Sequence, residues 1–508
     1  MSEMSNEIFS EICKIVGNEN ASMRKLDREV YSHDISPLPG VFGLVFDTLP
    51  DIVVRPGNSQ EVSNIVKVAY KKQIPVIPRG AGTWGLGGAV PAFGGIVLDM
   101  TRMNKIHSID KDNLCITAEP GVTWKKIDDF AAKNSLGLGA YPSSAPAATV
   151  GGWLGTGGVG LGTYKYGGAG DQVRTLEVVL PDGRIIETGF EKVANNSTGF
   201  DLTRLFVGSE GTLGIITKAT IKLRPKPKST NVFAFDFSEL EDACMSIRKI
   251  VHSNLRPWHL GFFDSDHYRF LNLTENSKFT CDFKIRLIIV FEGEKEIVEN
   301  ECNICKNIIE KCKGREVDKE ETIKCWEERY YEFRAKHLGP TVVPYEVFVP
   351  VSGINEAIEQ TEKLAKSLKL TIGIGATLCD ENTVALMPYY FSDESKVVRF
   401  LSHLSFTKKL ADMSISLGGH PAGLGLFYAP FLAKRERENV LEPMTDIKCA
   451  LDPKNIMNPG KLIESSTRYG FNIPPFAFRA GLEMFALASK ILPRQEIKMV
   501  ENKEGKET

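Results

Sequence analysis

Residues 78–88, PRGAGTWGLGG, have the residue types and spacing of a phosphate-binding loop. Gly80, Gly82 and Gly85 spell G-x-G-x-x-G after the apolar stretch IPVIP (74–78), and Asp99 follows where a Rossmann fold places its ribose-binding acid. In NAD-binding Rossmann domains, however, this loop runs directly into a helix. Here it continues as TWGLGGAVPAFGG, whose glycines and proline disfavour a helix. We therefore interpret the Rossmann spacing as coincidental and Asp99 as the last residue of an edge strand.

The same glycines support a different kind of phosphate site. Successive glycines can point several backbone N–H groups into one concavity, a nest that binds phosphate oxygens without a helix. Two further glycine-rich runs, 151–162 and 208–214, are also bordered by predicted strands. Three such loops predict a ligand that is much longer than a mononucleotide.

The elements around these loops follow from local patterns. Residues 51–56 and 94–100 read as strands on either side of a helix that opens with a capping box, Asn58 with Glu61, and IPVIP adds a third strand. This order predicts a small sheet with a parallel pair. Residues 139–170 read as one long functional loop, 175–189 as a hairpin, and 208–227 as a glycine-rich entry to a long strand.

The second half of the chain has a different pattern. Strand-like stretches at 231–237 and 284–293 alternate with helical, charge-rich segments at 295–312 and 353–368, which predicts an α+β domain with an antiparallel sheet. The turn-rich stretch 452–461 closes it, and a tail with an amphipathic portion at 476–492 follows. The cysteines at 302, 305 and 312 lack a fourth ligand nearby and read as incidental thiols of a helix.

Composition excludes several classes of protein. The chain has 508 residues, 42% hydrophobic and 25% charged, with a net charge of −2. These values are typical of a globular protein and do not favour nucleic-acid binding. No stretch of about 18 apolar residues predicts a transmembrane segment, and the acidic N-terminus does not resemble a secretory signal. We therefore expect a cytoplasmic protein, with any membrane association arising through a partner.

Four sequence blocks carry a resemblance to a known family. They read VIPRGAGTWGLGGAVP with GGIVLDMTRMNKI, PSSAPAATVGGWLGTGGVGLGTYKYG, DQVRTLEVVLPDGRIIETG, and DLTRLFVGSEGTLGIITKATIKLRPKP. The chain resembles the flavoproteins of the vanillyl-alcohol oxidase superfamily, and within it the glycolate oxidase flavin subunit and D-lactate dehydrogenase. The resemblance implies an α+β fold with a two-subdomain, p-cresol methylhydroxylase (PCMH) type FAD-binding domain and a cap domain of antiparallel sheet and helices.

The resemblance also divides the chain into segments. It implies an FAD-binding domain at 46–227, a cap domain at 228–440 and a return to the FAD domain at 441–465. A helical segment at 1–45 precedes them, and a C-terminal extension at 466–508 would dock a partner.

The resemblance further assigns FAD-binding residues, in three groups. The pyrophosphate would be held by the first loop, the ribityl chain and ring by the second, and the adenosine end by the third. The first group is Arg79, Gly80, Ala81, Gly82 and Thr83; the second is Pro142, Ser143, Thr149, Gly151 and Gly152; the third is Glu210, Gly211, Gly214 and Ile216. Some relatives tether the flavin through a histidine at the position of Thr83, so non-covalent FAD is expected here.

The cap domain departs from the pattern of its metal-containing relatives. Their ligands are two histidines in H-x-G-D-G-N-x-H and a glutamate in G-E-H-G-x-G, where this chain has Thr371, Leu378 and Gly419. We expect no metal. His420 keeps the histidine of the second motif and is the candidate base for a hydroxyl proton. Arg329 in WEER matches a family arginine that meets a substrate carboxylate.

These observations predict an FAD-dependent dehydrogenase acting on CH–OH groups, with a small 2-hydroxy acid (D-lactate- or glycolate-like) or an alcohol as substrate. The chain has no iron–sulfur motif, so electrons would pass to a separate partner, an iron–sulfur electron-transfer protein. The assembly would be a homo-oligomer or a hetero-complex. The alternative is a non-catalytic subunit that carries FAD for electron relay or for structure.

Overall fold

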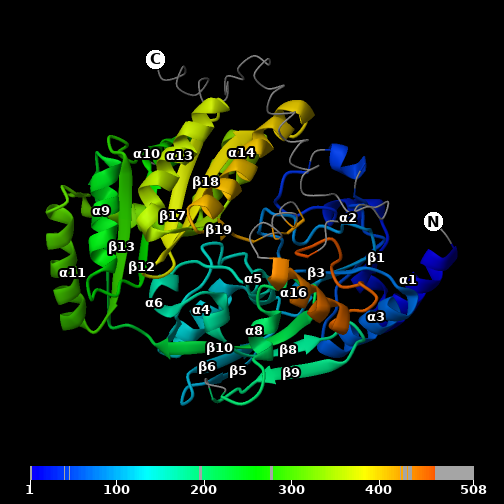
Figure 1. Cartoon of the computed structure of the whole chain (residues 1–508). Coiled ribbons are helices and arrows are strands. Elements are labelled where there is room, and N and C mark those ends of the chain that lie inside the picture. Colours follow the sequence, from blue (N-terminus) through cyan, green and yellow to red (C-terminus); the bar gives the residue numbers. More distant parts are fainter. Residues whose placement is uncertain are drawn as a thin grey trace. The chain divides into compact units, whose positions relative to one another are not determined.

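The computed structural model describes residues 3–463, apart from residues 39, 45, 194–196, 275–277, 424, 427–428, 430–431 and 433–437. The described chain forms two compact units (Figure 1). Unit 1 contains residues up to 158, residues 168–226 and the described residues from 423 onward; unit 2 contains residues 159–167 and 227–422. The expected helix at 476–492 and the C-terminal extension lie outside the described residues. No helix among the described residues is long and apolar enough to cross a membrane.

Unit 1 begins with a four-stranded sheet of order β1-β2-β4-β3. Its strands are β1 (Ala21–Ser22), β2 (Ile52–Val54), β4 (Ile96–Asp99) and β3 (Val76–Arg79), and the pairs β2–β4 and β3–β4 are parallel, as predicted. The capping box is confirmed, because the Asn58 side chain accepts from the Glu61 N–H at the start of α3 (Ser59–Lys72). The interpretation of Asp99 as an edge-strand residue is wrong, since β4 lies between β2 and β3.

The second sheet of unit 1 has the order β5-β6-β10-β8-β9, with β7 paired to β10. Its predicted hairpin is confirmed: β8 (Val173–Val179) pairs with β9 (Ile185–Gly189), and the Gly183 N–H donates to the Leu180 carbonyl across the turn. The predicted long strand is β10 (Ile215–Pro225). The other strands are β5 (Ile106–Asp110), β6 (Cys115–Ala118) and β7 (Leu136–Leu138).

The prediction of one long loop at 139–170 is only partly correct. Within it lie α5 (Val150–Thr156), α6 (Thr163–Tyr166) and the start of α7 (Ala169–Gln172). Glycine disfavours helix in isolation, but Thr149 caps α5 and its apolar Val150, Trp153 and Leu154 are buried. Tertiary packing therefore overrides the local glycine signal. Of these helices, α6 belongs to unit 2; besides α3, α5 and α7, unit 1 contains α1 (Glu3–Val16), α2 (Lys25–Val30), α4 (Trp124–Lys133), α8 (Leu202–Phe206) and α16 (Glu438–Leu451).

Unit 2 is built on a nine-stranded antiparallel sheet of order β14-β11-β13-β12-β17-β18-β16-β19, with β15 also paired to β18. The predicted strands and helices of this half, and the α+β class, are confirmed. The strands are β11 (Ser229–Phe237), β12 (His259–Asp264), β13 (Ile285–Gly293), β14 (Arg315–Glu316), β15 (Thr341–Pro344), β16 (Val347–Pro350), β17 (Ile372–Leu378), β18 (Thr383–Ser392) and β19 (His420–Pro421).

Helices cover the two faces of this sheet differently (Figure 1). A continuous helical layer packs on one face: α9 (Leu240–Val251), α11 (Lys295–Glu310), α13 (Ile354–Ser367) and α14 (Val397–Ser416). The other face contacts α10 (Ser265–Thr274) and α12 (Lys319–Glu327). Tyr390 packs against Phe406 of α14, whereas its neighbour Tyr389 packs against His267 of α10. We call this second face the α10 face.

Candidate functional site

The first glycine-rich loop has a run of backbone N–H groups without partners among the described residues. Residues 80–95 contain no helix, so the loop lacks the element that a Rossmann site requires. No backbone N–H from Ala81 to Gly88 donates a hydrogen bond to any residue that the structure describes. Gly82 and Gly87 have positive φ values of 67° and 77°, the conformation that turns successive N–H groups the same way. The loop can therefore bind an anion through its backbone.

All three glycine-rich segments meet within unit 1. A Cβ on Gly80 would clash with the Thr149 hydroxyl, and one on Gly211 would clash with the Pro78 ring. The Glu210 N–H donates to the Gly155 carbonyl at 2.8 Å, which joins the third segment to the second. Glycine is required at these contacts because the segments approach more closely than a side chain allows. Sequence-distant loops thus form one continuous surface.

The second segment is held at the start of α5. The Thr149 hydroxyl accepts from the Gly152 N–H, and a Cβ on Gly151 would lie 2.7 Å from the Pro120 side chain. Pro142 is buried and Ser143 is partly buried in the turn that precedes α5. The indole Nε1 of Trp153, in the first turns of α5, is buried without a partner among the described residues. The predicted residues of this group therefore lie in one short stretch of packed backbone.

The third segment is anchored around Glu210, which adopts a positive φ of 50°. Its side chain accepts from the Gly425 N–H, and its carbonyl accepts from the Asn458 amide at 2.7 Å. Gly214 packs against Val178, which pairs with Ile216 on β10. The closing stretch 452–461 thus fixes the backbone of the third segment.

Arg79 folds against the N-terminal segment. Its guanidinium donates to the His33 carbonyl at 2.6 Å and lies 5.3 Å from the centre of the Tyr31 ring. The Ile35 N–H donates to the carbonyl of Gly82, so the N-terminal segment also holds the loop itself. Thr83 is partly buried.

In unit 2, His420 lies on β19 at the edge of the sheet. Its Nδ1–H donates to the Pro421 carbonyl at 3.0 Å, and its ring packs on Phe348 at 4.9 Å. Because a carbonyl can only accept, this bond selects the tautomer in which Nε2 is the basic nitrogen. The arrangement suits a proton acceptor.

Arg329 lies in the short helix η4 (Glu328–Tyr330) that follows α12. Its guanidinium carbon lies 4.5 Å from the centre of the Trp326 ring and 4.2 Å from that of the Tyr330 ring, and Nη1 donates to the Trp326 carbonyl. The charge of Arg329 lowers the pKa of His259, so Arg329 lies near β12. In the sheet, β12 is four strands away from β19, which carries His420. That spacing corresponds to about 19 Å. The structure places both predicted residues in unit 2 but does not bring them together.

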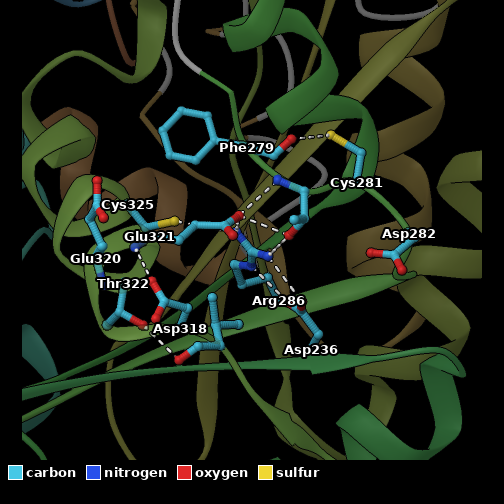
Figure 2. A network of polar contacts seen from close by, with 12 residues as sticks. Asp236, Phe279, Cys281, Asp282, Arg286, Asp318, Glu320, Glu321, Thr322 and Cys325 are labelled. Carbon is cyan, nitrogen blue, oxygen red and sulfur yellow. Dashed lines mark hydrogen bonds and ion pairs between the residues drawn. The ribbon is translucent and has the colours of Figure 1, made fainter.

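A buried ionic network positions the segment that carries Arg329. Figure 2 shows Arg286 of β13 between Asp236, Glu321 and Cys325. Its guanidinium binds Asp236 through two bonds of 2.6 and 2.9 Å and Glu321 of α12 at 2.7 Å. Bidentate, charge-assisted bonds of this kind are directional. The network therefore fixes α12, and with it Trp326 and Arg329, relative to the sheet.

Sequence reasoning missed two residues of unit 2. His259 is 5% exposed, and burial, followed by the charge of Arg329, lowers its pKa to about 3. Glu346 precedes β16, and burial raises the pKa of its carboxyl to about 7. No sequence motif contains either residue. Tertiary packing alone brings His259 near Arg329 and Glu346 beside the paired strands β16 and β19.

The positions of the relatives' metal ligands do not fit a metal here. Leu378 is fully buried and offers no donor, and Thr371 is exposed. A Cβ on Gly419 would clash with the Phe348 carbonyl oxygen, so this backbone cannot carry the glutamate of the motif. No cluster of three or more metal-ligating side chains occurs among the described residues.

Comparisons with known proteins agree with this architecture. Residues 50–189 match the FAD binding domain family, and residues 226–462 match the C-terminal domain family of FAD linked oxidases. The glycolate oxidase subunit GlcD of Bacillus subtilis is 31% identical over 92% of this chain and 98% of its own length. A D-lactate dehydrogenase of Archaeoglobus fulgidus is 34% identical over 81% of this chain and 91% of its own length.

A solved structure shows the same fold. That of p-cresol methylhydroxylase covers 91% of this chain and 98% of its own, with a TM-score of 0.79 and 20% identity. The expected PCMH-type FAD-binding fold is therefore confirmed. With both domain families matched in order and two relatives above 30% identity, the chain belongs to the family of FAD-linked oxidases and is an FAD-dependent oxidoreductase.

Proposed function

We propose that this protein oxidises a small 2-hydroxy acid, D-lactate- or glycolate-like, or a related alcohol. The observation that carries the proposal is the likeness to a glycolate oxidase subunit and a D-lactate dehydrogenase, at 31% and 34% identity, over both domains. Two features, each within its own unit, support it: the loop of residues 81–88 in unit 1 has N–H groups available for an anion, and unit 2 contains a histidine of fixed tautomer.

FAD would be bound by the three segments of unit 1. The unpaired N–H groups of residues 81–88 fit the pyrophosphate oxygens, and Arg79 adds a positive charge beside them. The segment from Pro142 to Gly152 would meet the ribityl chain and ring, and the segment from Glu210 to Ile216 the adenosine end. Thr83 has no ring nitrogen to form a covalent bond, so the cofactor would be held non-covalently.

In the reaction, bound FAD supplies a hydride acceptor. His420 would take the hydroxyl proton at Nε2, since its Nδ1–H is already committed to Pro421. Arg329 would hold the substrate carboxylate through a charge-assisted pair. In a small 2-hydroxy acid the hydroxyl and the carboxylate are on adjacent carbons, so one bound molecule cannot reach both residues across four strands. The two roles are therefore alternatives, and each is tested with its own variant.

Electrons would leave FAD for a separate protein, which we propose is an iron–sulfur electron-transfer protein. Its docking segment would be the C-terminal extension, residues 466–508. Any membrane association would then come through that partner. The competing function is a non-catalytic subunit that carries FAD for relay or structure, which the absent metal ligands at Thr371, Leu378 and Gly419 would permit.

An anaerobic screen distinguishes these functions. The purified protein is mixed with a panel of 2-hydroxy acids, alcohols and aldehydes, with and without divalent metal, and the visible absorbance of oxidised flavin is followed. We expect bleaching by at least one 2-hydroxy acid, at a rate that added metal or a chelator does not change.

If no compound bleaches the flavin while reduced iron–sulfur proteins do, the relay function replaces the proposed one. Dependence of the rate on metal would overturn the assignment of a site without metal.

A further inference from the structure

Two buried nitrogen atoms beside Trp326 lack hydrogen-bond partners. They are Nδ1 of His259 and Nε of Arg329, and neither has a partner among the described residues. Leaving such a group unsatisfied destabilises the folded state, so an unpaired polar atom in a native protein calls for an explanation. Here two of them lie against the same indole ring.

The strand pairing explains why they are neighbours. On β12, His259, Gly261 and Phe263 alternate onto the α10 face, where Phe263 stacks on His267 at 4.3 Å. Gly261 lacks a side chain, and a Cβ there would lie 2.9 Å from the His259 ring. The imidazole therefore lies along the strand, with its centre 5.7 Å from that of the Trp326 ring.

The geometry of Arg329 leaves one edge of its guanidinium for a ligand. The rings of Trp326 and Tyr330 both lie against the guanidinium, and Nη1 is committed to the Trp326 carbonyl. An Nε–H donates within the plane of the guanidinium, so its partner must approach in that plane. A carboxylate meets this requirement because it binds the Nε edge of arginine through two parallel bonds.

The imidazole adds a donor without adding charge. Because burial and Arg329 lower the pKa of His259 to about 3, its ring is neutral near pH 7 and carries one N–H. In the Nδ1–H tautomer it donates to an anion that Arg329 neutralises. The pair thus offers one positive charge and at least two N–H groups, which matches a single carboxylate.

We propose that His259 is a second carboxylate-binding residue, donating from Nδ1 to the ligand carboxylate that Arg329 holds through its Nε edge. This inference rests on the proposed function, and within it on the role of Arg329, because the carboxylate is that of the 2-hydroxy acid or of its keto-acid product. It adds a residue that neither sequence motif contains.

Binding of pyruvate and oxalate to the oxidised holoenzyme tests the proposal without turnover, because neither compound has a hydride to donate. Affinities are measured by calorimetry. We expect His259→Phe to weaken binding about tenfold, the effect of one lost hydrogen bond to a charged group. His259→Asn, whose amide can replace the Nδ1–H, should recover binding to within about threefold of the native protein.

The matched control is His267→Phe. His267 is also buried on the α10 face and also has its pKa lowered to about 3 by burial, but its Nδ1 already contacts the Tyr389 hydroxyl at 3.0 Å. We expect this variant to bind pyruvate and oxalate as the native protein does. Retained FAD content and an unchanged melting temperature establish that each variant is folded.

The outcomes separate this inference from the proposed function. Native affinity in His259→Phe, with loss in Arg329→Lys, overturns the role of His259 and leaves Arg329 as the carboxylate residue. Native affinity in both variants, or no binding by the native protein, overturns the pair. The anaerobic screen decides the proposed function independently, since bleaching by a 2-hydroxy acid needs neither result.

Discussion

At the scale of single residues, Gly419 shows how one close backbone contact excludes a metal-binding glutamate. The backbone of β19 passes so near the Phe348 carbonyl that a Cβ at this position would clash with it. The strand pairing of Phe348 with His420 depends on that approach. A glutamate at 419 would therefore separate β19 from β16, and the same strand could not then hold His420 in its present position.

Glu346 is the second residue with consequences of its own. The Ala422 N–H donates to its carbonyl, and Val347 and Phe348 pair with Pro421 and His420, so Glu346 lies beside the strand pair that holds His420. Its carboxyl makes no hydrogen bond or ion pair to any described residue, and burial raises its pKa to about 7. A raised pKa means that the folded protein binds this proton more tightly than the unfolded chain does.

This difference predicts the pH dependence of stability. The unfolded glutamate has a pKa of about 4.3. The stabilising contribution of the Glu346 proton is therefore fully present below about pH 4.3 and is lost as the pH rises towards 7. Glu346→Gln removes this loss, so its urea midpoint should rise relative to that of the native protein between these pH values.

Glu359, an exposed residue of α13, provides the control. The urea midpoint of Glu359→Gln should change with pH in the same way as that of the native protein. Parallel midpoint curves for Glu346→Gln and the native protein would show that Glu346 is not buried in this way.

At the scale of elements, α12 depends on a few ionic contacts. Arg286 is completely buried, and it joins β13 to Asp236 of β11 and to Glu321 of α12. Tyr268 and Phe283 also lie against its guanidinium, at 4.9 and 4.4 Å. Removing one member of a buried ion pair leaves the other charge uncompensated in a medium of low polarity.

We therefore predict that Arg286→Met destabilises unit 2 by about 3–5 kcal/mol. Hydrogen exchange followed by mass spectrometry should show faster exchange in α12 and at Trp326 than elsewhere in the unit. The double variant Arg286→Met with Asp236→Leu removes the bidentate pair and leaves Glu321 with its bonds from Thr280, so it should recover part of the loss.

Arg269→Met breaks an exposed pair with Asp266 and gives the matched control, with an expected cost below about 1 kcal/mol. Equal protection of α12 in Arg286→Met and Arg269→Met would show that the network does not position the helix.

At the scale of the whole molecule, the cofactor joins segments that are far apart in the sequence. The first, second and third glycine-rich segments pack together in unit 1, and the closing stretch fastens the third through Asn458. A ligand bound by all three stabilises the folded state by mass action, by about 2.7 kcal/mol at a concentration 100 times its Kd. FAD should therefore raise the melting temperature in a concentration-dependent way.

Because Thr83 offers no ring nitrogen, we predict that acid precipitation releases all the flavin into the supernatant. Absorbance of the supernatant and fluorescence of the washed pellet measure the two fractions. A fluorescent pellet would contradict this prediction, because it would show that a side chain other than that of Thr83 binds the flavin covalently.

The amino-acid sequence alone determined the elements that depend on neighbours along the chain. Asn58 and Glu61 predicted a helix start, Pro181 to Gly183 a hairpin turn, and the glycines of 80–88 a nest without a helix; each depends on local backbone preferences. The resemblance of whole blocks supplied the family and the cofactor.

Tertiary structure decided what depends on strand pairing and packing. Asp99 lies in an inner strand because β4 pairs with β2 on one side and with β3 on the other. Helix α5 forms because its apolar side is buried. His259 meets Arg329 only because β12 and α12 pack together, and His420 lies apart because β17, β18 and β16 come between. These placements depend on contacts between distant segments, whose order no local pattern encodes.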